Sequence, residues 1–234
     1  MPRILLHVCC GPCSLMPIVR LREEGWEVTA FFYNPNIHPQ DEWMRRLEAM
    51  RQAADALNVP LMEEGEAVVP AFWVKALDGT LEEGERCRLC YRPRMERTAE
   101  RATALGFEAF TSSLLYSVYQ HHETIRAEAE RAAEHCGAAF LYRDFRPWWR
   151  DGIALCRELG LYRQKWCGCI LSRREALIQQ EAAARRKAAE QEAKRERAAR
   201  LAAEAEERRR RREAAEAKKR LREKWALMRG ALQG

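Results

Sequence analysis

The regular alternation of short apolar runs with helical patterns across the first 172 residues most constrains the fold of this chain. The runs predicted as strands are residues 4–8, 27–33, 61–62, 109–112 and 138–142. The segments predicted as helices are residues 15–24, 40–57, 68–77, 87–105, 117–135 and 152–159. Strands that alternate with helices form a mainly parallel sheet covered on both faces. The sequence therefore predicts an α/β fold, with a loop at residues 78–85.

The last part of the chain, residues 173–234, has a different composition, dominated by Ala, Glu, Arg and Lys. Glu precedes Arg or Lys by four residues repeatedly, as in Glu181–Arg185 and Glu190–Lys194, which is the favourable orientation on a helix. Large apolar residues are too sparse to sustain a heptad seam, which argues against a coiled coil. We therefore predict two parts, an α/β domain at residues 1–172 and a long, charged, single-helix extension at residues 173–234.

The charge of the chain is divided unequally between these two parts. The whole sequence has 41 Lys and Arg against 35 Asp and Glu, a net charge of +6, but residues 173–234 alone carry 20 basic and 11 acidic residues, a net charge of +9. Two interpretations of the extension stay open, a solvated helix without a role and an arm that binds the phosphate backbone of a nucleic acid.

Neither a membrane nor a secreted location is predicted. No run approaches the roughly 18–20 apolar residues that a membrane helix needs, and the apolar stretch before Cys9 is too short for the core of a signal peptide. The sequence therefore indicates a cytoplasmic protein without a membrane partner.

The chain has nine cysteines, and most of them fall into three tight clusters. In a reducing cytosol, this pattern indicates metal binding or redox chemistry rather than a disulfide framework. Cys9, Cys10 and Cys13 follow the first predicted strand directly, at the edge of a parallel sheet where binding sites collect. Cys136 and Cys156 stand alone and are interpreted as structural.

Cys87 and Cys90 form a C-x-x-C pair at the predicted start of a helix, where the helix N-terminus lowers the pKa of a thiol. Together with Cys9 and Cys10, this pair can complete a four-thiolate site for iron or for zinc, and the spacing does not choose between the metals. Cys167-Gly-Cys169 is a third cluster, whose single glycine permits a strained, reactive disulfide; metal ligation and plain packing are its alternatives.

Other residues at the predicted edge of the sheet add possible substrate contacts. His38 lies in the loop after the second strand, and residues 142–150 combine aromatic rings with Asp144 and Arg146. This aromatic and basic segment is suited to stacking on a nucleoside and clamping it, although Trp148 and Trp149 are also large enough to cap the core.

Six segments taken together resemble the QueH family of epoxyqueuosine reductases. They occur in order across residues 3–172 and read LLHVCCGPCS, FFYNPNIHP, GERCRLCYRPRM, FTSSLLYSVYQ, YRDFR and LYRQKWCGCILS. Val118 stands where this family usually has Pro, and residues 173–234 lie outside the resemblance.

The resemblance implies that the epoxide of epoxyqueuosine, at the wobble position of tRNA, is reduced by two electrons to the cyclopentene of queuosine, with loss of water. It implies a nucleotide-binding, adenine-nucleotide-hydrolase-like fold and a [4Fe-4S] cluster ligated by Cys9, Cys10, Cys87 and Cys90. Cys167 and Cys169 would form a redox-active pair. Cys13 is the candidate ligand for an additional mononuclear iron, and the electron donor and oligomeric state stay open.

The resemblance also places further residues near the substrate. The candidate proton donors or substrate contacts are His38, Tyr119 and Asp144, and Tyr33 is a further candidate donor. The candidate tRNA-binding residues are Arg146, Arg163 and Lys165.

Two other functions compete with this interpretation. A zinc-dependent or sulfur-transfer tRNA enzyme would be colourless and, if it used a nucleotide, would need a glycine-rich phosphate loop, which the sequence lacks. A non-catalytic binding protein would depend on residues 173–234 and would tolerate Cys167→Ser.

Overall fold

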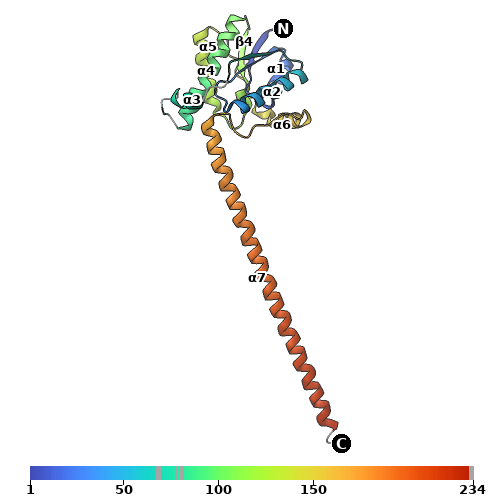
Figure 1. Ribbon diagram of the computed structural model, residues 1–234. Coiled ribbons are helices and arrows are strands. Elements are labelled where there is room, and N and C mark those ends of the chain that lie inside the picture. The colour runs from blue at the N-terminus through green and yellow to red at the C-terminus, as the bar shows by residue number, and fades with distance from the viewer. Residues whose placement is uncertain (67–69, 77–78, 80–81, 232–234) are drawn as a thin grey trace. The chain divides into compact units, whose positions relative to one another are not determined.

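The computed structural model describes residues 1–66, 70–76, 79 and 82–231 (Figure 1). The chain divides into two compact units, Met1–Ala176 and Leu177–Gly234. In the described residues, no helix is both long enough and apolar enough to cross a membrane.

The first unit is built on a four-stranded, wholly parallel sheet. Its strands are β1 (Arg3–His7), β2 (Glu27–Tyr33), β3 (Leu61–Glu64) and β4 (Ala109–Ser112), in the spatial order β3-β2-β1-β4. The side chains of β1 from Ile4 to His7 are fully buried, as expected for a strand covered on both faces. The predicted α/β fold with a parallel sheet is therefore confirmed.

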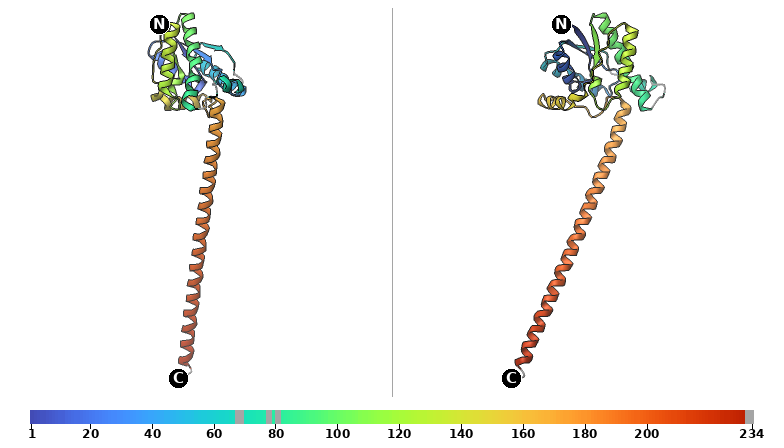
Figure 2. Two further views of the ribbon diagram at one scale, coloured as in Figure 1. Left: turned by 90° about the vertical axis from the view of Figure 1, so that its left-hand side faces the viewer. Right: turned by 180° about the vertical axis from the view of Figure 1, so that it is seen from behind.

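Helices cover both faces of this sheet. Helices α1 (Gly11–Glu23) and α2 (Gln40–Ala56) pack together on one face, and α4 (Glu83–Ala104) and α5 (His122–Cys136) pack together on the other (Figures 1 and 2). The remaining helical elements are α3 (Pro70–Ala76), η1 (Ser113–Tyr116), η2 (Arg146–Trp148), α6 (Trp149–Glu158) and α7 (Ile170–Ala231).

Gly11 sets the close approach of α1 to α2. A Cβ atom at this position would lie 2.1 Å from the backbone oxygen of Ala49, so no other residue fits without moving one of the helices. This glycine brings the start of α1, with its cysteines, against α2.

The strand order places a switch point between β1 and β4. The chain proceeds from β1 outward to β2 and β3 and then returns to the opposite side of β1 to form β4. Ligands of open α/β sheets bind where the strand order reverses in this way, outside the carboxyl ends of the strands. The residues that follow β1 and β4 therefore face the expected site.

Two helices begin four residues earlier than predicted. Helix α1 begins at Gly11 rather than at residue 15, so Cys13 is helical, because a proline in the first turn costs no hydrogen bond. Helix α4 begins at Glu83 rather than at Cys87, and its acidic first turn favours a helix N-terminus. Residues 83–85 of the predicted loop are therefore helical, and positions 78, 80 and 81 lie outside the described residues.

The structure also differs from the prediction at one helix and one strand, and a second predicted helix is described in part. Positions 68, 69 and 77 of the helix predicted at 68–77 lie outside the described residues, and the helix predicted at 117–135 begins only at His122, as α5, with residues 117–121 outside any helix. The strand predicted at 138–142 is reduced to one bridge, between Phe110 and Phe140. Phe110 donates its backbone N–H to the Ala139 oxygen and accepts the Leu141 N–H, both at 2.9 Å, and β4 ends two residues later, so the pairing extends no further.

Helix α7 accounts for the charged extension. It runs without interruption from Ile170 to Ala231, and the side chains described from Leu177 to Trp225 are exposed. A long, charged C-terminal helix is therefore confirmed.

Candidate active site at the carboxyl edge of the sheet

Three buried thiols gather where β1 passes into α1. Cys9 and Cys10 follow β1, Cys13 lies in the first turn of α1, and the three side chains are 7%, 1% and 7% exposed. Their Sγ atoms all lie within 4.8 Å of one another, and no other group of three such metal-binding side chains is found in the described part of the chain. We call Cys9, Cys10 and Cys13 the thiol triad.

The triad has the electrostatics of a soft anionic ligand set. Hydrogen bonds from Cys10 and then Cys13 hold the pKa of Cys9 well below its usual value. Burial raises the pKa of Cys10, and the hydrogen bonds of Cys13 to its two neighbours raise its own pKa. One thiolate supported by two thiols is therefore the favoured state, and thiolate sulfur is the ligand that zinc and iron–sulfur clusters prefer.

Two polar side chains from distant segments contact the triad. Gln164 Nε2 donates to Cys10 Sγ at 3.0 Å and to Cys13 Sγ at 3.4 Å. Ser113, the first residue after β4, accepts a hydrogen bond from the Cys9 backbone N–H at 3.2 Å and donates to Cys9 Sγ at 3.8 Å. The switch point between β1 and β4 is thus occupied by the triad and its donors.

Cys87 and Cys90 lie one turn apart on α4, and the expected lowering of their pKa is wrong. Burial raises the pKa of Cys87 to about 11 and that of Cys90 to about 12. Because α4 begins at Glu83, both thiols lie beyond its first turn, outside the reach of the helix dipole. Arg94 Nη2 donates to Cys90 Sγ at 3.2 Å, and the charge of Arg94 lowers the pKa of Cys90, which offsets part of the effect of burial.

The Cys167-Gly168-Cys169 loop lies close to this pair on α4. Burial is the main reason that the pKa of Cys87 is raised, and the nearness of Cys167 raises it further; Cys167 acts on the pKa of Cys90 in the same direction. Cys167 is exposed and its Sγ donates to Ser172 Oγ at 2.9 Å, whereas Cys169 is only 3% exposed. Thiols from α4 and from the loop before α7 therefore lie near one another.

A buried ion pair fixes this loop to α2. Arg46 Nε donates to Glu42 Oε1 at 2.7 Å, and both side chains are nearly inaccessible, at 1% and 0% exposed. The two Nη atoms donate to the backbone oxygens of Cys167 at 2.9 Å and Trp166 at 2.8 Å. Tyr162 donates to the second carboxylate oxygen of Glu42 at 2.6 Å. We call Arg46, Glu42 and Tyr162 the loop clamp.

His38 joins the same loop from the other side. Its Nδ1 accepts the Ile170 backbone N–H at 3.0 Å, and its own backbone N–H donates to Gly168 oxygen at 2.8 Å. Burial lowers the pKa of His38 to about 4, so the ring is neutral and carries its proton on Nε2. Nε2 is buried and has no hydrogen-bond partner among the described residues.

The remaining predicted residues lie apart from the thiols. Tyr119 is 80% exposed and places its ring edge-on to Trp149, with 5.7 Å between centroids. Asp144 accepts two side-chain hydrogen bonds from Arg146, at 2.9 and 2.7 Å, which lower its pKa and keep it ionised. No hydrogen bond or ion pair within the described part joins Tyr119, Asp144 or Arg146 to a cysteine.

Arg163 and Lys165 are exposed on the segment between α6 and α7. They flank Gln164, whose side chain reaches the triad. Basic groups are therefore presented beside the thiol site.

Six site residues escaped prediction from the sequence: the three residues of the loop clamp and Arg94, Ser113 and Gln164. Arg94 stands four residues after Cys90 on one helix, a spacing that brings side chains together. Ser113 directly follows a predicted strand. Nothing in the sequence signals the contacts of Arg46 and Gln164, which bridge segments more than 100 positions apart.

The chain matches known proteins over the whole first unit. The family model described as epoxyqueuosine reductase QueH matches residues 4–175. The protein of that name from Dehalococcoides mccartyi is 36% identical over 177 residues, which covers 74% of this chain and 94% of the relative. Its namesake from Thermotoga maritima is 35% identical, with 75% and 92% covered.

Two solved structures are similar to part of this chain, at low identity. A predicted subunit of a tRNA methyltransferase from Methanocaldococcus jannaschii is 12% identical, with a TM-score of 0.46 over 66% of this chain and 75% of the other. A deacetylase of teicoplanin biosynthesis is 11% identical, with a TM-score of 0.45 over 67% and 83%.

Proposed function

The chain belongs to the QueH family of epoxyqueuosine reductases, and we propose that its reaction is carried by the thiol triad together with the thiols of α4 and of the loop before α7. It is an oxidoreductase of queuosine tRNA modification. The proposed substrate is epoxyqueuosine at the wobble position of tRNA. Both carbon–oxygen bonds of the epoxide break, a carbon–carbon double bond forms, and two electrons and two protons convert the oxygen to water.

The observation that carries this proposal is the buried triad at the switch point of the sheet. Three sulfur atoms within 4.8 Å of one another fit the requirements of a metal centre with thiolate ligands. We propose a [4Fe-4S] cluster held by Cys9, Cys10, Cys87 and Cys90. When bound, such a cluster supplies electron transfer.

Cys13 belongs to the same buried group, and two roles compete for it. It replaces one of the α4 thiols as a cluster ligand, or it holds an additional mononuclear iron. Cys13→Ser distinguishes them, because loss of a cluster ligand removes the visible absorption, whereas loss of a separate iron lowers the iron content and leaves the absorption in place.

Cys167 and Cys169 are the proposed redox pair. Oxidation of two thiols to a disulfide releases two electrons and two protons, which is what reduction of the epoxide to an alkene and water consumes. Cys167 is exposed, so an external thiol or dithionite can reach it to reduce the disulfide again. The loop clamp supports this role because it fixes the backbone oxygen of Cys167.

Two residues are proposed to make hydrogen bonds to the substrate. His38 is proposed as a hydrogen-bond donor to the substrate rather than as an acid, since its ring is neutral and its proton lies on a buried Nε2 with no partner among the described residues. Asp144 is ionised by its contact with Arg146, so it is proposed as a hydrogen-bond acceptor that positions the substrate rather than as an acid.

The aromatic and basic residues nearby are proposed to hold the flipped wobble nucleoside and its phosphates. The exposed ring of Tyr119, supported by Trp149, offers a stacking surface. Arg146, Arg163 and Lys165 supply positive charge for the tRNA backbone.

The decisive experiment is an anaerobic assay with tRNA that carries epoxyqueuosine and dithionite as the reductant. We expect nucleoside mass spectrometry to show a product lighter by one oxygen atom for the intact protein and for Cys136→Ser, a matched thiol outside the site. We expect Cys167→Ser to lose turnover and to keep its metal. Turnover that survives in Cys167→Ser would contradict the proposed redox pair.

Metal analysis of the anaerobically purified protein tests the cofactor. Broad visible absorption that dithionite bleaches, with about four irons per chain, supports the cluster. Stoichiometric zinc without colour, persisting after anaerobic reconstitution, would overturn it in favour of the zinc-dependent alternative.

A further inference from the structure

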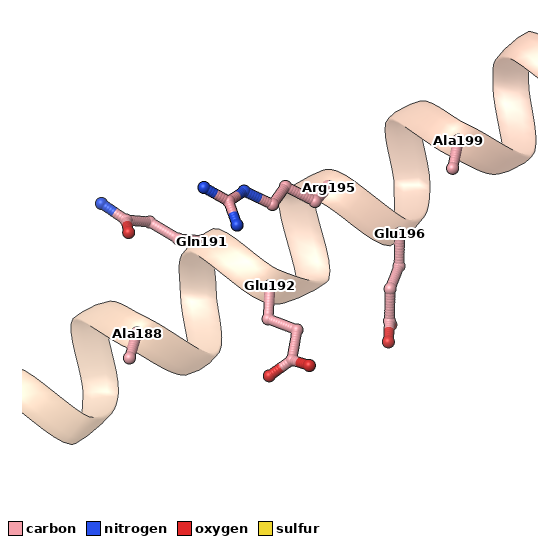
Figure 3. Close-up of a pocket in the computed structure, with 6 residues that line it drawn as sticks. All are labelled: Ala188, Gln191, Glu192, Arg195, Glu196 and Ala199. Atoms are coloured by element: carbon pink, nitrogen blue, oxygen red, sulfur yellow. The ribbon is translucent and has the colours of Figure 1, made fainter.

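The family match ends at residue 175, so α7 beyond that point is a feature of this chain that the proposed reaction does not use. Its charge is uneven along its length. Figure 3 shows the middle of the helix, where Glu192, Arg195 and Glu196 project from neighbouring turns and opposite charges alternate. Residues 208–224 instead hold ten basic and three acidic residues, a net charge of +7.

The charges of this distal segment are sorted onto two faces of the helix. With 3.6 residues per turn, positions three and four apart share a face. One face carries five basic side chains and no acidic one between residues 208 and 225, and we call it the basic strip: Arg208, Arg211, Arg212, Lys219 and Arg222. The neighbouring face, which borders the strip at Lys219, mixes both signs and holds Glu213, Glu216 and Glu223 with Arg209, Arg220 and Lys224.

Several cations of the basic strip are available to a partner. Arg208, Arg212 and Arg222 have no ion-pair partner among the described residues, whereas Arg211 pairs with Glu207 at 2.6 Å and Lys219 with Glu223 at 4.0 Å. All side chains from 208 to 225 are exposed. An isolated helix does not need its charges separated in this way, because i,i+4 pairs of opposite charge would stabilise it better.

We propose that the basic strip binds the phosphate backbone of the tRNA substrate; this inference rests on the proposed function. The strip extends for about 21 Å at 1.5 Å per residue, long enough to contact several successive phosphates. Charge complementarity selects the occupant, since RNA is the densest polyanion that an enzyme of tRNA modification meets. Trp225, 58% exposed and adjacent to the strip, offers a ring on which a base can stack.

The proposal predicts a large and salt-dependent effect. Each phosphate contact contributes about 0.7–0.9 to the slope of log K against log salt. Loss of three contacts therefore lowers the magnitude of that slope by about 2–3 and weakens binding at 0.1 M salt by about 100-fold.

The test compares two variants of the full chain that carry the same change in net charge. R208Q/R212Q/R222Q removes charge from the basic strip, and R209Q/R220Q/K224Q removes it from the mixed face. Affinity for fluorescently labelled tRNA is measured between 50 and 300 mM KCl, and circular dichroism checks that α7 stays helical. We expect the first variant to lose affinity and slope and the second to lose several-fold less.

Equal losses of affinity in the two variants would overturn the proposal, because the effect would then follow net charge alone. Unchanged affinity in both variants would also overturn it. Turnover at saturating tRNA keeps this test separate from the proposed function. If the strip variant binds normally while the protein still reduces the epoxide, only the inference about α7 fails. If the intact protein binds tRNA but reduces nothing, the proposed function fails instead.

Discussion

Removal of the cation at the centre of the loop clamp is expected to destabilise the first unit strongly. Arg46→Met deletes three hydrogen bonds and leaves the carboxylate of Glu42 with no exposure to water. The remaining contacts of that carboxylate are Tyr162 at 2.6 Å and the half-exposed Arg45 at 3.4 Å. Breaking a buried ion pair from one side costs about 3–5 kcal/mol.

Urea unfolding followed by tryptophan fluorescence measures this loss. With an m value of about 2 kcal/mol/M, the midpoint is expected to fall by about 1.5–2.5 M. Arg126→Met is the matched control, since its ion pair with Glu130 on α5 is about half exposed on both sides and a surface ion pair contributes about 0–1 kcal/mol.

The double variant Glu42→Gln/Arg46→Met separates the buried charge from the lost contacts. Without a carboxylate to leave unpaired, it is expected to be more stable than Arg46→Met by about 1–2 kcal/mol, because burying an unpaired charge costs more than burying an amide. The reasoning is refuted if the double variant loses the full sum of the two single changes, or if Arg46→Met costs less than about 1 kcal/mol.

Three further predictions concern other parts of the first unit. Gly168→Ala places a side chain at a φ of +117°, with its Cβ 2.9 Å from Ile37, and should destabilise by about 1–3 kcal/mol in urea; Gly160→Ala, where the space is open, should cost less. Gln164→Leu removes the N–H donors to Cys10 and Cys13 and should make the reduction potential of the loaded metal centre more negative in a potentiometric titration, and an unchanged potential would contradict this. Burial raises the pKa of Glu128, but hydrogen bonds from Arg92 and Arg131 outweigh it and leave that pKa below 4.5. The stability that Glu128 contributes is therefore present above pH 4.5 and lost as the pH falls further, so unfolding free energies at pH 7 and pH 3.5 should differ less in Glu128→Gln than in the parent.

The strands of the sheet were predictable because burial on both faces leaves a readable apolar run. The ranges 27–33 and 109–112 coincide with β2 and β4. The starts of α1 and α4 were not predictable in the same way. Glycine, proline and glutamate near a helix N-terminus resemble a loop when only local propensity is considered. The error at α4 had a chemical consequence, because it suggested a low pKa for thiols that burial keeps protonated.

The grouping of the cysteines shows where sequence patterns end and tertiary structure begins. Parallel strands bring the segments after β1 and β4 to one edge by topology, so the contact of Cys9 with Ser113 follows from the strand order alone. No such rule governs the segment between α6 and α7, whose Gln164 reaches the triad and whose Cys167 oxygen accepts from Arg46. That segment has no regular structure of its own, and its position depends on the buried cation of Arg46. Burying this cation is unfavourable unless its N–H groups find acceptors. The clamp gives each of the three side-chain nitrogens of Arg46 an acceptor, one carboxylate and two loop carbonyls, so the same contacts that stabilise Arg46 also determine where the proposed redox pair lies.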